Sequence, residues 1–277
     1  MVKAEKALEH VEEALEWSDF KKAVELAAQL PWHKLELRAM SHLMDGMISA
    51  AAGLSDGSED ELKAYELVVI IGDTLFQQAG VYRPAVELRV NSALFNKGVV
   101  LAQIGRTEEA IKTYDRLVSR VGASRQRGLR ESVVRALFNK GASLASLQRR
   151  EEAIGVFDDL VSRYRDDPEP SMTEAVGKAL INKGVALAEL NRFAEAIAVL
   201  DEVVERWGNS TDGKLRRRAS KALLNKASAL IQLDQQKHAL TTYDEILDRF
   251  GNDAEPSLRE VLTMARLGRD SLAKELN

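Results

Sequence analysis

Apolar residues recur along most of the chain at intervals of three and four, which is the spacing of one face of an α-helix. In the clearest stretch this pattern predicts a helix over 129–147 and a second helix over 151–164. Three polar residues, Gln148, Arg149 and Arg150, separate the two patterns. A turn this short makes the two helices antiparallel neighbours, so the stretch predicts a helical pair, whose first helix we term A and whose second we term B.

The helical pair returns along the chain with a constant period. The segment LFNKG at 94–98 is followed by LFNKG at 137–141, LINKG at 180–184 and LLNKA at 223–227, each 43 residues after the previous one. The short turns recur in the same step, beginning at Gly105, Gln148, Asn191 and Asp234. A fixed period in this range is typical of a solenoid, in which each unit buries its apolar face against its neighbours.

Degenerate copies of the pair flank the regular ones. Met44, Asp45 and Gly46 stand where Asn-Lys-Gly is expected, Phe20 begins a segment like the start of helix B, and 258–277 aligns with 129–148 as a final helix A. Terminal repeats of a solenoid are expected to be atypical because one face meets water. We therefore predict about six helical pairs and a final helix in one continuous solenoid. Its parts are degenerate repeats over 1–89, four 43-residue repeats over 90–256 and a capping helix over 257–277.

Two kinds of residue predict where the helices begin and end. Ser171 and Glu174 have the spacing of a capping box, which would open helix A of the third regular copy. Glycines follow helix B in three copies and predict a left-handed residue that closes its last turn. They are Gly122, Gly208 and Gly251.

The first regular copy carries a recognisable set of residues: Leu94, Gly98 and Leu101 on helix A, then Ala110 and Tyr114 on helix B. The next three copies fill the same positions, with Ala in place of Gly in the last one. This set resembles the signature of the tetratricopeptide repeat. The resemblance implies an all-α, right-handed superhelical solenoid of antiparallel helix pairs. In it, the glycine of helix A and the alanine of helix B let the two helices approach closely.

The chain departs from the family pattern in three respects. Lysine stands where leucine is usual, the closing proline is missing, and the period exceeds 34 by nine residues, which indicates a longer helix A and loop. The lysines are Lys97, Lys140, Lys183 and Lys226, and we expect their stems to cover apolar surface with the ammonium groups in water. HEAT-like helix pairs have similar periods, but they lack the Gly–Ala crossing.

An asparagine recurs two residues before the helix-A glycine. Asparagine is a poor residue for a helix interior because its amide competes for backbone hydrogen bonds. In the family this position lines the concave groove, and in O-linked N-acetylglucosamine transferase a row of such asparagines holds the backbone of an extended peptide. The alternative is that each amide bonds the neighbouring repeat and sets the spacing between repeats. The row consists of Asn96, Asn139, Asn182 and Asn225.

Basic residues lie four positions before three of these asparagines, so they share the same helix face. They are Arg135, Lys178 and Lys221. A basic row beside an amide row resembles the carboxylate clamp of chaperone-binding tetratricopeptide domains, although that clamp uses different residue types in successive repeats. The basic row predicts a preference for an acidic or extended peptide. A solvated groove wall is the alternative interpretation.

Composition excludes several other kinds of function. The net charge is −4, and it divides into −7 over residues 1–90 (16 acidic, 9 basic) and +3 over residues 91–277 (27 acidic, 30 basic). Neither part is basic enough to predict a nucleic-acid partner.

There is no cysteine, and the four histidines have no metal-binding spacing, so we expect no metal or cofactor. The most apolar stretch, near 68–71, is too short to cross a bilayer, and a cytoplasmic protein is expected.

These features predict a non-enzymatic scaffold that holds an extended or acidic peptide in the groove of the A helices. No phosphate-binding loop, nucleophile motif or pair of catalytic carboxylates is present in the sequence. We expect a protein or peptide partner, and a monomer or weak homodimer. Two alternatives stay open, namely a structural spacer or self-assembly module and a regulatory sensor region of a larger enzyme system.

Overall fold

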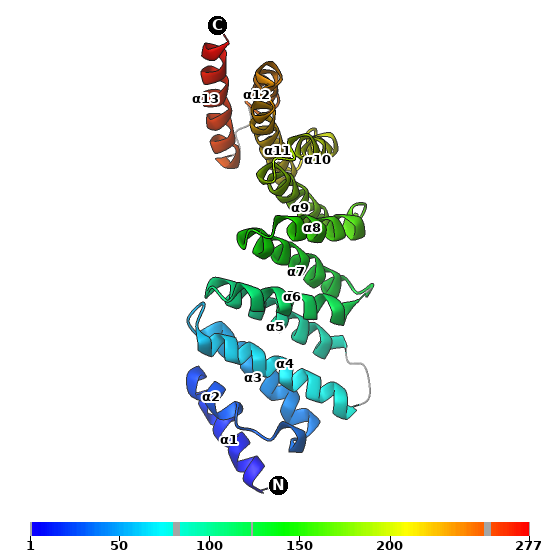
Figure 1. The fold of residues 1–277 in the computed structure, drawn as a ribbon. Coiled ribbons are helices and arrows are strands. Elements are labelled where there is room, and N and C mark those ends of the chain that lie inside the picture. Colours follow the sequence, from blue (N-terminus) through cyan, green and yellow to red (C-terminus); the bar gives the residue numbers. More distant parts are fainter. Residues whose placement is uncertain (1, 80–83, 123, 252–255, 277) are drawn as a thin grey trace. The chain divides into compact units, whose positions relative to one another are not determined.

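The computed structural model describes residues 2–79, 84–122, 124–251 and 256–276. Within these ranges the chain is all α-helical, without a strand, which confirms the predicted fold class (Figure 1). Two short 3-10 helices, Trp32–Lys34 and Pro256–Leu258, accompany thirteen α-helices. The α-helices are α1 (Val2–Glu16), α2 (Phe20–Ala27), α3 (Leu37–Gly53), α4 (Glu59–Ala79), α5 (Pro84–Gln103), α6 (Thr107–Val121), α7 (Arg127–Ser146), α8 (Arg150–Tyr164), α9 (Pro170–Glu189), α10 (Phe193–Trp207), α11 (Gly213–Gln232), α12 (Gln236–Phe250) and α13 (Arg259–Glu275).

The helices alternate as the sequence period requires. In the four regular copies the A helices α5, α7, α9 and α11 each have 20 residues, and the B helices α6, α8, α10 and α12 each have 15. The helices predicted at 129–147 and 151–164 are found as α7 and α8. Six pairs and a thirteenth helix lie within the described ranges, as predicted. The three-part division of the chain stays a prediction.

The turn between helices A and B has one backbone geometry in every regular copy. Gly105, Gln148, Asn191 and Asp234 have positive φ angles, of 81°, 62°, 59° and 59°. The next residue donates its backbone N–H to a carbonyl five positions earlier, as Arg149 does to Leu144 at 3.0 Å. This is the Schellman closure of a helix end, and it satisfies carbonyl groups that the helix leaves without partners.

Of the three glycines that follow helix B, only one has the positive φ of the predicted left-handed closure, and its ψ of −131° lies outside the αL region. Gly122 has a φ of 56°, whereas Gly208 and Gly251 have right-handed angles of −60° and −61°. The predicted capping box is also wrong, because α9 begins at Pro170 and Ser171 already lies in its first turn. Proline has a backbone suited to the first helical position, so the helix starts at Pro170, two residues before the Met172 that a cap at Ser171 would have placed first.

The chain divides into two compact units, Met1–Ser143 and Leu144–Asn277. In unit 1, consecutive helices from α1 to α6 pack on one another around fully buried side chains such as Met44, Leu94 and Tyr114. In unit 2, α8 to α13 pack in the same sequential manner, and α9 also contacts α11, as α11 contacts α13. Phe157, Leu200 and Phe250 belong to the core of unit 2.

The glycine of helix A faces a side chain of helix B in its own pair. A Cβ atom placed on Gly98 would lie 2.4 Å from Cε1 of Tyr114, and one on Gly184 would lie 2.9 Å from Cδ2 of Leu200. Ala110 is fully buried, as expected of the position opposite the glycine. The space left by the missing Cβ, however, is taken by the residue four positions after the alanine. That residue reaches one helical turn further along helix B.

Candidate functional site

The four asparagines lie half-buried on successive A helices, at one position of the repeat. In unit 1 both amides are engaged by the preceding B helix. Nδ2 of Asn96 donates to the hydroxyl of Tyr65 at 3.3 Å, and Nδ2 of Asn139 donates to the hydroxyl of Tyr114 at 3.4 Å. These two asparagines therefore connect neighbouring repeats, which is the structural role considered for the row.

The tyrosines that accept these bonds lie in apolar surroundings. Burial raises the pKa of Tyr114 above its usual value, and the hydrogen bond from Asn139 partly opposes that rise. The pKa of Tyr65 is also raised, mainly by burial and then by the negative charge of Glu61. A buried hydroxyl needs a hydrogen-bond partner, and the asparagine amide supplies one.

The two asparagines of unit 2 have no such acceptor. The residues that correspond to Tyr114 are Phe157 for Asn182 and Leu200 for Asn225, and neither has a hydroxyl group. In the part of the chain that the structure describes, neither amide makes a side-chain hydrogen bond. Each amide offers two donors and an acceptor oxygen to another molecule.

The final helix changes the pattern once more. At the asparagine position α13 has Gly268, and at the position of Gly98 helix α11 has Ala227. A Cβ atom on Gly268 would lie 2.5 Å from Cζ of Tyr243, so the tyrosine ring packs directly on α13. Gly268 of α13 thus leaves room for the ring of Tyr243. In the pair to which Tyr243 belongs, the helix-A glycine is replaced by Ala227.

The three predicted basic residues have three different surroundings. The guanidinium of Arg135 stacks over the ring of Phe95, with Cζ 3.9 Å from the ring centroid. Nζ of Lys178 lies 2.8 Å from Oε1 of Glu174, and the hydrogen bond from Lys178 is the main cause that lowers the pKa of this carboxyl. Lys221 is half-buried and makes no hydrogen bond or ion pair with another described residue.

The repeated lysines, which we expected to end in water, instead bridge successive helices. Each forms an ion pair with an acidic residue of the preceding B helix, and Arg269 continues the row. The signal was in the sequence, because four of the five acidic residues also recur every 43 positions. The pairs are Lys97–Glu66 at 2.8 Å, Lys140–Asp115, Lys183–Asp158 and Lys226–Asp201 at 2.5 Å, and Arg269–Asp244 at 2.7 Å.

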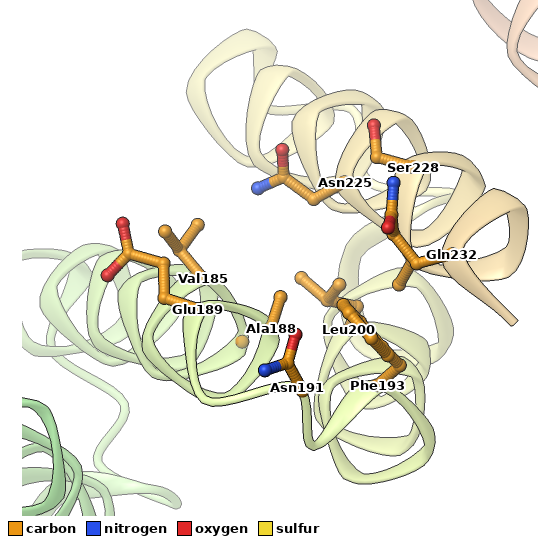
Figure 2. Close-up of a pocket in the computed structure, with 11 residues that line it drawn as sticks. Val185, Ala188, Glu189, Asn191, Phe193, Leu200, Asn225, Ser228 and Gln232 are labelled. Carbon is orange, nitrogen blue, oxygen red and sulfur yellow. The ribbon is translucent and has the colours of Figure 1, made fainter.

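A pocket of about 410 Å³ lies beside Asn225 in unit 2. Figure 2 shows Asn225 on α11 facing α9, with Leu200 and Phe193 of α10 between the two helices. This pocket was not predicted from the sequence, although Leu200 interrupts a row of aromatic residues at one repeat position. The lining residues are Gly184, Val185, Ala188, Glu189, Asn191, Phe193, Leu200, Asn225, Ser228, Ala229 and Gln232.

The described residues form neither a metal-binding cluster nor a membrane-spanning helix. No group of three or more histidine and acidic side chains could hold a metal ion in the ranges that the structure covers. In the same ranges, no helix has the length and apolar character needed to cross a bilayer.

Antiparallel helix pairs repeated at a constant period define a helical repeat protein, and its A-helix surface carries the candidate site. Sequence models of the tetratricopeptide repeat match residues 79–127 and 181–254, and residues 135–167. These ranges cover more than half of the chain, which therefore belongs to the tetratricopeptide repeat family. No curated protein sequence matches the chain.

Solved structures with a similar fold include BtubC from P. vanneervenii, with 18% sequence identity and a TM-score of 0.57 over 89% of this chain and 94% of that one. The apo form of RapI has 12% identity and a TM-score of 0.56 over 98% and 84% of the two chains. YrrB, described as a TPR protein with an unusual peptide-binding site, has 13% identity and a TM-score of 0.49 over 85% and 100%. Identities this low show the fold alone. The tetratricopeptide repeat fold suggests a protein-interaction scaffold, and the family is typically non-catalytic.

Proposed function

We propose that the chain is a non-enzymatic scaffold that holds an extended peptide on the A-helix surface of unit 2. The observation that carries the proposal is the pair of half-buried amides, Asn182 on α9 and Asn225 on α11, which have no hydrogen-bond partner among the described residues. An amide side chain can donate to a peptide carbonyl and accept from a peptide N–H at once. It therefore holds a backbone without selecting a side chain.

The spacing of the two amides suits an extended backbone. Helices α9 and α11 are in contact, and packed helices lie about 8–10 Å apart. An extended chain rises about 3.3 Å per residue, so equivalent points on the two helices are about three residues apart along a bound peptide. The two asparagines would then bind two peptide units of the same strand.

A preference for acidic peptides is part of the proposal, and it depends mainly on Lys221. This ammonium group lies one helical turn before Asn225 and has no acidic partner in the described part of the chain. Lys178 is less available because Glu174 already binds it at 2.8 Å. Arg135, which stacks on Phe95, would give the A-helix surface of unit 1 a similar preference of its own.

The test uses random-sequence peptides displayed on phage and selected on the full chain. Replacing Asn182 and Asn225 together by alanine should weaken the selected peptides at least about tenfold, because several hydrogen bonds are lost. Helicity and the urea midpoint should stay unchanged. Lys221→Gln should weaken acidic peptides more than neutral ones, and this difference should vanish at high salt.

The matched control is the double variant Asn96→Ala with Asn139→Ala, which removes the same groups from unit 1. It should bind the selected peptides as the wild type does but unfold at a lower urea concentration, because two tyrosine hydroxyls lose a partner. If the unit 2 variant keeps full peptide affinity, or if the selection enriches no peptide, the proposal is wrong.

Self-association is a second candidate, supported by the exposed face of α13. Leu267 is 68% exposed and Met264 is 51% exposed. The residues equivalent to Leu267 in α5 and α9, Phe95 and Ile181, are only 7% and 9% exposed. Sedimentation equilibrium should show a dimer that Leu267→Lys dissociates. A wild-type chain that is monomeric at all accessible concentrations excludes this candidate.

A further inference from the structure

The pocket of unit 2 lies where the repeat otherwise places an aromatic ring. Helices α6, α8 and α12 have Tyr114, Phe157 and Tyr243 at the position where α10 has Leu200. The ring of Tyr114 fills the space beside the glycine of its own pair, Gly98. The shorter side chain of Leu200 reaches Gly184 in the same way, and the pocket of about 410 Å³ is bordered by both residues.

The residue that would meet the missing ring is still present. In unit 1, Nδ2 of Asn139 donates to the hydroxyl of Tyr114 at 3.4 Å, and Asn96 donates likewise to Tyr65. Asn225 occupies the same repeat position and lines the pocket, but Leu200 offers it no acceptor. Figure 2 shows its side chain directed from α11 toward α9, across the pocket.

We propose that this pocket binds a phenol ring, the side chain of a tyrosine in a bound peptide. The ring lies on Leu200 between α9 and α11, and its hydroxyl accepts a hydrogen bond from Nδ2 of Asn225. The bound tyrosine thus supplies from outside the contact that Tyr114 makes within the chain. That the phenol belongs to a peptide rests on the proposed function, whereas the phenol site itself does not.

The lining of the pocket matches the two ends of a phenol. Val185, Ala188 and Leu200 offer apolar surface to the ring, and the polar groups of α11 stand along the opposite side, as Figure 2 shows. A phenol has an apolar body and one polar tip, so it satisfies both surfaces at once. The volume also lies within the range of about 300–1,000 Å³ that is usual for small-ligand pockets.

The experiment titrates the ¹⁵N-labelled full chain with p-cresol, which is the tyrosine side chain alone, and with toluene, which lacks the hydroxyl. Saturable NMR shifts of the Asn225 side-chain amide are expected with p-cresol, while the Asn139 amide stays unmoved. Toluene should bind about three- to tenfold more weakly, since it cannot accept the hydrogen bond. Toluene that binds as tightly as p-cresol contradicts the role given to Asn225.

Two variants separate the pocket from a nonspecific apolar site. Leu200→Tyr places the ring in the pocket from within, so p-cresol affinity should fall at least tenfold, whereas Leu200→Met, of similar volume, should keep it. Asn225→Ala should bind p-cresol and toluene equally. This second variant keeps the test valid if Leu200→Tyr does not fold, which circular dichroism would show.

The proposal is overturned if p-cresol leaves the Asn225 amide unshifted, or if folded Leu200→Tyr binds p-cresol as the wild type does. The phenol site can be refuted independently of the proposed function, because the binding of p-cresol does not require a bound peptide. A chain that binds a selected peptide through Asn182 and Asn225 but does not bind p-cresol overturns the phenol site alone. A chain that binds p-cresol at Asn225 but selects no peptide supports the site and contradicts the scaffold.

Discussion

Replacing Gly98 by alanine should destabilise the protein, although alanine is the better helix former. In a helix interior, the change from glycine to alanine by itself stabilises by about 1 kcal/mol. At Gly98 the added Cβ would lie 2.4, 2.7 and 2.9 Å from three ring atoms of Tyr114. Carbon atoms in contact are about 3.5–4.0 Å apart, so the ring must move by about 1 Å.

The surroundings of Tyr114 resist that movement. Its side chain is 1% exposed, its ring centroid lies 6.2 Å from that of Phe95, and its hydroxyl accepts the bond from Asn139. Overpacking of this kind costs about 1–3 kcal/mol, and losing the hydrogen bond adds about 1 kcal/mol. After the gain in helix propensity of about 1 kcal/mol, Gly98→Ala should lower the free energy of unfolding by about 1–3 kcal/mol.

Urea unfolding followed by far-UV circular dichroism measures this difference, and two other glycines provide the scale. A Cβ on Gly155 in α8 would meet no atom of the described residues within 4 Å, so Gly155→Ala should stabilise by up to about 1 kcal/mol. Gly184→Ala should be nearly neutral because Leu200 can shift toward the pocket beside it. If Gly98→Ala stabilises as much as Gly155→Ala, the ring of Tyr114 is not held as described.

The pair formed by α11 and α12 indicates a second substitution that should compensate for Gly98→Ala. There Ala227 stands at the position of Gly98, and Gly268 of the next helix makes room for the ring of Tyr243. Asn139 is the residue equivalent to Gly268. In a double-mutant cycle, Asn139→Gly should therefore cost less in the Gly98→Ala background than in the wild type. Equal costs in the two backgrounds would contradict this coupling.

Two further predictions concern charge. Because burial raises the folded-state pKa of Tyr114 above the unfolded value of about 10, the folded chain keeps a proton that the unfolded chain releases, so stability should fall as pH rises above about 10. Tyr114→Phe should show a smaller fall in urea midpoint over this range; an identical fall would assign the effect to other groups. Lys183→Met should cost less than about 1 kcal/mol, since Asp158 is half exposed, and the loss should shrink in 1 M salt. A salt-independent loss would instead indicate packing by the lysine stem.

The helices could be predicted from the sequence because the same apolar spacing recurs at a fixed period. Four copies constrain each boundary, and α7 and α8 lie within two residues of their predicted ends. The backbone conformation of the residue that closes each helix was harder to predict than the helix boundaries, since a glycine at that position does not by itself make φ positive. In the turns between A and B, the left-handed position is held by Gln148, Asn191 and Asp234, because a short turn between antiparallel helices requires that backbone geometry.

The position of the asparagine row could be predicted, but the state of each amide could not be predicted from that row alone. Whether an amide is engaged depends on a residue of the preceding B helix, 25 positions earlier in the regular copies. A tyrosine there accepts the bond from Asn139, whereas phenylalanine and leucine leave Asn182 and Asn225 without an acceptor. The tertiary contact decides whether an amide is engaged within the chain, and only the structure shows which residues meet.

The contacts that recur in every repeat and the contacts that differ between repeats have different causes in this chain. The ion pair at Lys183 and its equivalents recurs in every regular copy and continues at Arg269, so it belongs to the stacking of one pair on the next. A specific ligand needs a place that differs from the rest, because identical sites along a solenoid do not fix the register of a bound chain. Leu200 breaks the aromatic row, and the pocket lies beside it together with Asn225, whose amide has no acceptor among the residues that the structure describes. The departure from the period therefore favours this part of the A-helix surface as the point where a bound peptide is held in register.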